Sequence, residues 1–282
     1  MKILVSIVTY NRLSLLQNLV DALNRQTYDN FDLLIINNSS NDGTQLWLNS
    51  LKDIIVINQD NSGSSGGQFT AFKYALENNY DYLWTMDDDV LPEDNCLEEL
   101  IKYSNNNAVL VPLRITPKSE IFYNECKYFN FTNPLKSLWK EIIKHKDLND
   151  DLLQIEGATF EGMFISANII SKVGLPYKFY FIFADDTDYC IRLLKNNYKI
   201  YLVKNAIMKR QLNLIENISL FNDWKAYYII RNIFLLDRLY GNILVKNLRP
   251  LFYFFKFLIK VKKMEDIKVL NKAFLDAYFY KI

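Results

Sequence analysis

Hydrophobic and polar positions in the first 115 residues follow two alternating patterns. Short runs rich in β-branched and aromatic residues alternate with longer stretches in which apolar residues recur every three or four positions. The short runs predict strands at residues 3–8, 32–36, 54–58, 82–86 and 108–112. The longer stretches predict helices at residues 13–24, 44–51, 68–78 and 93–103. This alternation is typical of an α/β fold with a mostly parallel, Rossmann-like sheet and helices on both faces.

The pattern becomes irregular after residue 115 and regular again after residue 156. Residues 116–156 are rich in Lys, Asn and aromatic residues and indicate an insertion. Two strand-like runs follow, at 157–166 and 180–183, and the second leads into a helix that ends near residue 196. Beyond about residue 215 the pattern is helical to the end. We therefore expect a catalytic or binding domain at 1–215 and a helical C-terminal region at 216–282.

Polar or small residues follow each of the first four predicted strands. They occupy residues 9–12, 37–44, 61–67 and 87–89. Ligands of parallel α/β sheets bind outside the carboxyl ends of the strands. Four such clusters therefore predict one binding site at one edge of the sheet.

Asp87, Asp88 and Asp89 directly follow the fourth predicted strand. Three adjacent carboxylates repel one another unless a cation compensates them, and a divalent ion with oxygen ligands could also hold a diphosphate. The alternative is an acidic turn that caps the next helix, since Pro92 and Glu93 come next. Their position at a central strand end favours the metal and nucleotide interpretation. The Asp spacing and central Gly of an EF-hand are missing.

The segment 61–67 contains Gly63, Gly66 and Gly67 just before the helix predicted to begin near Gln68. Glycines free backbone amides for close approach to an anion, and a helix N-terminus attracts negative charge. The segment matches neither the dinucleotide fingerprint nor the P-loop. A flexible connection between strand and helix remains the alternative.

Asp185 and Asp186 form a second acidic pair, which follows the apolar run at 180–183. One of these carboxylates could act as a general base on an acceptor hydroxyl. The alternative is an acidic first turn that complements the helix dipole. Both interpretations can hold together, because a general base in the first turn of a helix is also held rigidly in place.

The composition argues against several functional classes of protein. The chain has 282 residues and a net charge of +1, so it has no general attraction to nucleic acid. Three scattered cysteines indicate free thiols in a reducing cytoplasm, and no run approaches the roughly 20 apolar residues that span a bilayer. His145 is the only histidine and lies in a polar segment, which leaves Ser-His-Asp and Cys-His mechanisms without a base. We expect a cytoplasmic protein.

Residues 243–263 combine basic and aromatic side chains. One interpretation is an interfacial helix that lies on anionic lipid at the inner face of the cytoplasmic membrane. The other is an ordinary amphipathic helix that packs on the domain. Its apolar residues extend around more than one face, which favours partial burial.

Several motifs together resemble the family 2 inverting glycosyltransferases of GT-A fold. They are VSIVTYNR at 5–12, NSSNDGT at 38–44, DDD at 87–89, GLP at 174–176, FIFADDTDY at 181–189 and Arg192. Within that family, NSGSSGGQF at 61–69, WTM at 84–86 and YYIIRN at 227–232 are similar to bacterial galactofuranosyltransferases. Rhamnosyltransferases share much of this pattern. The ordered combination covers roughly residues 1–240 and is far more specific than any single motif.

The resemblance implies a role for each site residue. The nucleotide-binding residues would be Thr9, Asn11, Arg12, Asn37, Asn61, Gly63, Gly66, Gly67, Asp87 and Asp88. Asp89 with Asp87 would ligate Mn²⁺ or Mg²⁺. Asp186 would be the catalytic base, with Asp185 beside it, and 116–156 would lie on the acceptor side.

The chain departs from the family pattern at two places. Asn37 stands where the family usually has Asp, which can alter the base preference. The His that often serves as a further metal ligand is missing, and the region reads IMKR at 207–210. Either fewer protein ligands hold the metal, or a cationic side chain takes over part of its work on the diphosphate.

The resemblance implies transfer of a sugar from a nucleoside diphosphate donor, with UDP-galactofuranose as the first choice. The acceptor would be a hydroxyl of a growing cell-surface glycan, such as O-antigen or capsule, free or lipid-linked. Alternatives are a rhamnosyltransferase that uses dTDP-rhamnose and a catalytically weak subunit that binds sugar nucleotides. Nucleotidyl transfer would need a cationic glycine-rich loop near the N-terminus, where 9–12 supplies one charge.

Overall fold

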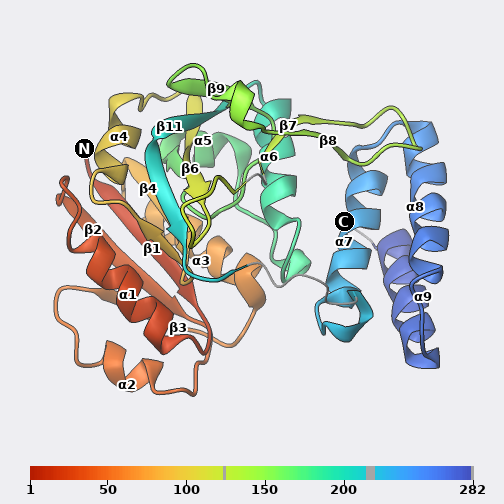
Figure 1. The fold of residues 1–282 in the computed structure, drawn as a ribbon. Coiled ribbons are helices and arrows are strands. Elements are labelled where there is room, and N and C mark those ends of the chain that lie inside the picture. The colour runs from red at the N-terminus through yellow and green to blue at the C-terminus, as the bar shows by residue number, and fades with distance from the viewer. Residues whose placement is uncertain (123–124, 214–219, 281–282) are drawn as a thin grey trace.

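The computed structural model describes residues 1–122, 125–213 and 220–280. Its centre is a nine-stranded sheet with the order β3-β2-β1-β4-β10-β6-β11-β5, in which β9 also pairs with β11 (Figure 1). The strands of this sheet are β1 (Ile3–Thr9), β2 (Phe31–Asn37), β3 (Ile55–Asn58), β4 (Tyr82–Asp87), β5 (Val90–Pro92), β6 (Ala108–Ile115), β9 (Leu152–Ile155), β10 (Phe164–Ser166) and β11 (Lys199–Arg210). A separate hairpin pairs β7 (Cys126–Phe129) with β8 (Trp139–Ile142).

Most strands of the sheet run in one direction. β1, β2, β3, β4, β6 and β11 are parallel to one another, whereas β5, β9 and β10 run the opposite way. Together with the helices described below, this confirms the predicted α/β class with a mostly parallel sheet.

Helices cover both faces of the sheet because the strands are apolar on both sides. The helices of this part are α1 (Leu13–Leu23), α2 (Thr44–Leu48), α3 (Gly63–Glu77), α4 (Cys96–Lys102), α5 (Ala167–Val173) and α6 (Asp185–Lys195). Alternate residues of β1 enter different cores. Val5 and Ile7 pack with α1 and α4, and Leu4 and Val8 pack with α3, α5 and α6.

The register of β1 brings the predicted site residues to one edge. Thr9 lies opposite Asn37 on β2, and Val8 lies opposite Asp87 on β4. The ends of three neighbouring parallel strands therefore meet, as the sequence predicted.

Four local predictions were wrong. Helix α3 begins at Gly63 rather than near Gln68, so its glycines lie inside the first turns. Only Phe164–Ser166 of the run 157–166 forms a strand. The run 180–183 is not a strand: its first residue ends a short 3₁₀ turn (Lys178–Tyr180), and φ is positive at Phe181 (64°) and Phe183 (70°). The last part of the insertion, β9, belongs to the main sheet.

Strand β11 was not predicted from the sequence. Its twelve residues include a register shift between Val203 and Ile207, where it pairs with β6. The polar Lys204 and Asn205 in this irregularity interrupt the apolar alternation that marks a strand.

Three helices form the C-terminal part: α7 (Ala226–Tyr240), α8 (Ile243–Leu258) and α9 (Met264–Phe279). They lie at one end of the molecule, with α7 nearest the sheet (Figure 1). This confirms the predicted helical region for residues 220–280, while the expected boundary at 215–216 falls outside the described residues. Among the described helices, none is long and apolar enough to cross a membrane.

A fully buried ion pair joins α8 to the rest of the protein. Arg249 Nη1 lies 2.8 Å from Asp237 Oδ1 on α7, and both side chains are 0% exposed. Arg249 Nη2 also donates to the carbonyls of Asn130 and Asn133, at 2.6 and 2.9 Å, in the connection between β7 and β8. One side chain thus holds three segments together.

We predict that Arg249→Ala lowers the free energy of unfolding by about 3–5 kcal/mol, because Asp237 and two carbonyls lose their buried partner. Denaturant unfolding followed by circular dichroism measures this change. Arg25→Ala is the control, since its pair with Asp94 is exposed and contributes little. An equal, small effect of both substitutions would contradict this role.

Candidate functional site

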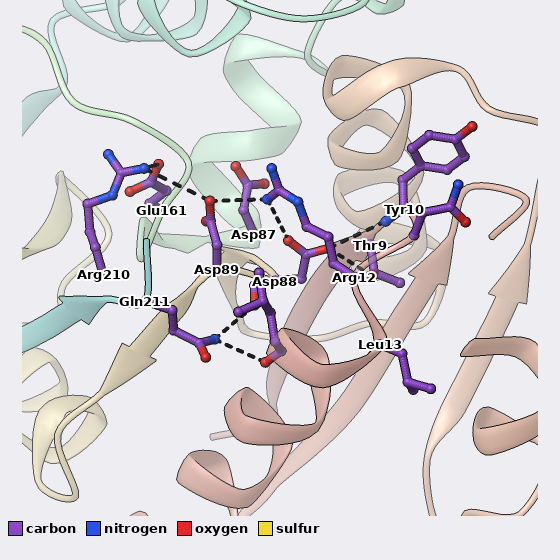
Figure 2. Close-up of polar contacts among 12 residues, drawn as sticks. Thr9, Tyr10, Arg12, Leu13, Asp87, Asp88, Asp89, Glu161, Arg210 and Gln211 are labelled. Carbon is purple, nitrogen blue, oxygen red and sulfur yellow. Dashed lines mark hydrogen bonds and ion pairs between the residues drawn. The ribbon is translucent and has the colours of Figure 1, made fainter. Parts of the chain in front are cut away.

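Asp88 organises the end of β4 (Figure 2). Its Oδ2 accepts a hydrogen bond from the Thr9 hydroxyl at 2.8 Å, and its Oδ1 accepts one from Arg12 Nη1 at 2.9 Å. Asp88 is buried, and Arg12 precedes the first residue of α1. Asp88 therefore ties the end of β4 to the end of β1 and the start of α1.

Asp89 is approached by two guanidinium groups from opposite sides (Figure 2). Its Oδ2 lies 3.1 Å from Arg12 Nη1 and 3.9 Å from Arg210 Nη2. Its Oδ1 is buried and has no hydrogen-bond partner. Such an atom costs free energy unless a further ligand occupies it.

Arg210 belongs to a network of charged residues that extends from Asp89 to Glu161 and Arg114. Its Nη2 also lies 4.0 Å from Glu161, and its guanidinium stacks over the ring of Phe122 at 4.6 Å. Glu161 is bound by Arg114, which also pairs with Glu125 at 2.7 Å. Arg210 is thus held from several directions, with its charge directed at Asp89.

Sequence reasoning missed Glu161 and Arg114. Both are charged residues in otherwise apolar runs, at 157–166 and 108–115. A charged residue inside a run that is expected to be buried needs a partner of opposite charge. The presence of Glu161 and Arg114 in such runs was therefore the sequence signal for a buried ion pair.

The end of strand β11 lies against the acidic turn Asp87–Asp89. Arg210 pairs with Val90 on β5, and the next residue, Gln211, donates its N–H to the Asp89 carbonyl at 2.7 Å. Gln211 Nε2 also donates to the Asp88 carbonyl at 3.1 Å. The backbone of the acidic turn is therefore fixed as well as its side chains.

Negative charge exceeds positive charge around Asp87. Burial, followed by the charges of Asp89, Glu161, Asp88 and Asp185, raises the pKa of Asp87 well above its usual range. The only polar side-chain contact recorded for it among the described residues is a 3.4 Å bond from Gln68 Nε2. Because Asp185 contributes to this pKa, the second acidic pair lies at the same site.

Asp185 and Asp186 open helix α6 after a strained turn. Ala184 has a φ of 71°, and the carbonyl of Phe181 accepts from the Ser65 N–H at 3.1 Å in the first turn of α3. Left-handed backbone at a non-glycine residue costs free energy, and a run of such residues in one turn is typical of functional sites. The packing of this turn on α3 places the two carboxylates near β4.

The two carboxylates differ in exposure. Asp185 is buried and its Oδ2 has no partner, whereas Asp186 is half-buried and accepts from the Thr187 hydroxyl at 3.2 Å through Oδ1. Burial raises both pKa values, and for Asp186 the charge of Asp185 is the next cause. Both carboxyls therefore retain a proton to higher pH than an exposed Asp does. Asp186 is the more accessible of the two.

Asp188 in the same motif is fully engaged inside the protein. It accepts from the Tyr180 hydroxyl and from Arg192 Nε, both at 2.9 Å, and from the Tyr240 hydroxyl on α7. It is 0% exposed. Asp188 fixes α6 and offers nothing to a ligand.

The glycines of α3 serve close packing. A Cβ at Gly63 would overlap the Phe181 carbonyl, and one at Gly67 would overlap the side chain of Val8 on β1. The Gly63 amide donates to Asn61 Oδ1 at 3.0 Å, and the Gly66 amide donates to the Ser62 carbonyl at 3.3 Å. Most amides that were expected to face an anion are thus already bonded.

A polar depression of about 490 Å³ lies beside the ends of β2 and β3. Asn37 is buried at its base and donates through Nδ2 to Gln45 and Asn58, at 2.9 and 3.0 Å. Asn11 borders the same region, with its Oδ1 bonded to the Asn41 amide at 2.7 Å. A planar ring with hydrogen-bonding edges fits such a surface.

The site suits a divalent cation that arrives with a diphosphate. Within residues 1–122, 125–213 and 220–280, no three His, Cys, Asp or Glu side chains gather as a self-sufficient metal site. Asp87 and the unpartnered Oδ1 of Asp89 nevertheless offer carboxylate oxygens amid excess negative charge. Mg²⁺ is commonly bound by one or two carboxylates together with substrate phosphates.

Comparison with known proteins agrees with the resemblance. Residues 4–172 match the model of the family described as Glycosyl transferase family 2. The dTDP-rhamnosyl transferase RfbF of Shigella flexneri is 24% identical over 250 residues, which cover 82% of this chain and 78% of that protein.

Three solved structures with a similar fold are distant in sequence. GalNAc-T7 with UDP, GalNAc and Mn²⁺ has a TM-score of 0.68 at 11% identity, and S. aureus TarS has 0.59 at 13%. The mannosyltransferase PcManGT of Pyrobaculum calidifontis, with GDP-Man and Mn²⁺, has 0.53 at 12%. Each match covers 99% of this chain, which spans 56%, 44% and 70% of the three proteins. These likenesses show the predicted GT-A fold.

We predict that Gly67→Ala destabilises the protein by about 1–3 kcal/mol, because the added methyl group pushes α3 away from Val8. Thermal or denaturant unfolding measures the change. Ser64→Ala in the same helix is the control and should be neutral, since alanine favours helix. Wild-type stability of Gly67→Ala would show that the contact can relax freely.

Proposed function

The chain belongs to glycosyl transferase family 2, and from that premise we propose that it transfers a hexose from a nucleoside diphosphate to a hydroxyl of a growing cell-surface glycan. The observation that carries this proposal is the meeting of the Asp87–Asp89 turn with Asp185 and Asp186 at one edge of the sheet. Two acidic centres are needed there for different purposes, one for the diphosphate and one for the acceptor proton.

The nucleotide would lie along the ends of β1, β2 and β4. The base fits the depression at Asn37, and the ribose and diphosphate would extend past Thr9 and Asn11 towards Asp87 and Asp88. The Asn37 amide already donates to Gln45 and Asn58. Other polar groups that line the depression would therefore form most of the hydrogen bonds to the edge of the base. Gly67 would shape this wall by allowing α3 to approach β1, Gly63 by allowing the turn at Phe181 to approach α3, and Gly66 by leaving room for the Ser62 side chain.

Two kinds of positive charge would stabilise the leaving diphosphate. Asp89 and Asp87 would hold Mn²⁺ or Mg²⁺, which when bound neutralises charge on the phosphate oxygens. Arg210 stands at Asp89 in the region where the family pattern has its additional metal ligand. Its guanidinium can donate to a phosphate oxygen in fixed geometry, so it would contribute to leaving-group stabilisation.

Asp186 would act as the general base of a single displacement. The acceptor oxygen forms a bond to the anomeric carbon as the bond from that carbon to the diphosphate oxygen breaks. The acceptor proton passes to Asp186, and the anomeric configuration inverts. Its half-buried position and raised pKa support this role over the more deeply buried Asp185.

The acceptor would approach from the side of the insertion. Phe183, which is 37% exposed, lies three residues before Asp186, and its ring is 6.2 Å from that of Trp139 on β8. Aromatic faces of this kind suit the apolar faces of sugar rings.

Two donors have support from different observations. The motifs at 61–69, 84–86 and 227–232 favour UDP-galactofuranose. The similarity to a dTDP-rhamnosyl transferase over 82% of the chain favours dTDP-rhamnose, which we place first. Thermal shift with Mn²⁺ against dTDP-rhamnose, UDP-galactofuranose, UDP-galactopyranose and UDP-glucose tests the proposal, because a bound ligand raises the melting temperature. No response to any sugar nucleotide would contradict it.

Asp186→Asn should lower the transfer rate by about 10²–10⁴-fold and leave donor binding unchanged, because it removes only the proton acceptor. The wild-type rate should rise with pH through about 7, since the base works deprotonated and burial raises the pKa of Asp186 to about 7. Transfer assays across pH, with donor binding by calorimetry, measure both effects. Asp94→Asn on the surface is the control, and near-normal turnover of Asp186→Asn would overturn the assignment.

Arg210→Ala should lower kcat/KM by about 10²-fold, with partial retention in Arg210→Lys, because the leaving diphosphate loses a donor. The concentration of Mn²⁺ required for half-maximal rate should also change. Lys209→Ala is a matched control, since neighbouring residues of a strand point to opposite faces. Equal effects of Lys209→Ala and Arg210→Ala would indicate a general loss of positive charge instead.

A further inference from the structure

One face of α8 exposes large apolar side chains along its whole length. It consists of Leu244, Leu248, Leu251, Phe252, Phe255 and Ile259, which we call the outer face of α8. These residues recur every three or four positions, so they form one stripe about 24 Å long. Phe255 and Ile259 are 61% and 86% exposed. An exposed apolar stripe of this size marks an interaction surface.

The opposite face of α8 is fixed to the protein. Val245, Pro250 and Phe257 are buried there, and Arg249 forms its buried pair with Asp237. The helix therefore cannot turn its outer face inward without breaking that pair. Figure 1 shows α8 at the far end of the molecule from β1, β2 and β3. The outer face of α8 therefore stays exposed on the folded protein.

Charge around the stripe is positive. Between Asp237 and Glu265 the sequence contains no acidic residue. Lys256, Lys260, Lys262 and Lys263 gather at the end of α8 beside Phe255 and Ile259, and all four are exposed. An apolar stripe that ends in a lysine cluster complements a surface that is apolar inside and anionic outside.

We propose that the outer face of α8 binds the surface of a bilayer that contains anionic lipids. The apolar stripe enters the boundary between headgroups and acyl chains, and the lysine cluster contacts lipid phosphates. The same face of a second copy fits less well, because residues 238–264 contain no acidic residue to pair with the lysines of an identical surface, and Glu265 and Asp266 follow only at the start of α9. The proposal does not rest on the transfer reaction, since it concerns a surface of the C-terminal helices alone.

Co-sedimentation of the full chain with vesicles tests the proposal. The probes are vesicles of phosphatidylcholine with and without phosphatidylglycerol, at low and high salt. We expect binding to the anionic vesicles, weaker binding to the neutral ones, and a loss of the difference at high salt, since salt screens the lysine cluster.

Two sets of substitutions separate the apolar and electrostatic contributions. Phe255→Glu with Ile259→Glu should lower binding to both kinds of vesicle at least tenfold. Replacing Lys256, Lys260 and Lys262 by Gln should lower binding to anionic vesicles by about fivefold per charge and leave neutral vesicles unaffected. Leu46→Glu is the matched control, because Leu46 is equally apolar and 78% exposed but lies on α2.

Circular dichroism and thermal unfolding verify that each variant is folded, which is expected because the changed side chains are exposed. Donor binding measured without vesicles should be the same in all of them, so a failed transferase assignment leaves the vesicle result interpretable. Absence of wild-type binding to anionic vesicles would overturn the proposal. So would a concentration-dependent dimer in light scattering that Phe255→Glu dissociates while vesicles do not bind.

Discussion

The compensation of buried negative charge at the end of β4 is the constraint on which the rest of the structure depends. Asp87, Asp88 and Asp89 follow an apolar strand at the centre of the sheet, with Glu161 close by. Their partners come from distant parts of the chain: Arg12 at the start of α1 and Arg210 at the end of β11. Strand β11 must therefore run along β6 and reach β5, where Gln211 also bonds the backbone of the acidic turn. Even so, Asp89 Oδ1 has no partner and the pKa of Asp87 is raised. A cation that arrives with a nucleoside diphosphate would compensate this remaining excess of negative charge.

Close packing of glycines brings the second acidic centre to the first. Gly67 lets α3 approach β1, and Gly63 lets the strained turn at 181–184 approach α3. Asn232 on α7 holds that turn by donating to the carbonyls of Ile182 and Phe183, at 2.9 and 2.7 Å. The C-terminal helices therefore support the turn that carries Asp186, besides presenting the outer face of α8. The C-terminal helices thus bear on both the proposed chemistry and the proposed membrane contact, of which the sequence indicated only the second.

The alternating pattern predicted β1, β2, β3, β4 and β6, the helices between them and the edge at which Thr9, Asn37 and Asp87 meet, but not the short β5. It succeeded there because buried parallel strands and amphipathic helices are local patterns. The Arg114–Glu161 part of the charged network was not predictable in the same way. Glu161 and Arg114 carry no motif, and β11 is interrupted by an irregularity, so their roles depend on long-range pairing. The glycines of 61–67 were expected either to bind an anion or to form a flexible connection. The structure places them in the first turns of α3, where they allow close contacts with Val8, Phe181 and Ser62, because composition does not reveal where a helix begins. Asp188 belongs to the same motif as Asp186 but is fully bonded inside, a distinction that only tertiary contacts make.

The central claim is that the edge formed by Asp87–Asp89 binds a nucleoside diphosphate together with a divalent cation. Calorimetric titration of dTDP and of UDP, with Mn²⁺ present or removed by a chelator, tests it most directly. The account predicts that Mn²⁺ raises the affinity for the preferred nucleotide at least tenfold and that the nucleotide raises the affinity for Mn²⁺ by the same factor, as linkage requires. It also predicts that Asp89→Asn removes this coupling. Equal affinity with and without the metal, or coupling that survives Asp89→Asn, would contradict it.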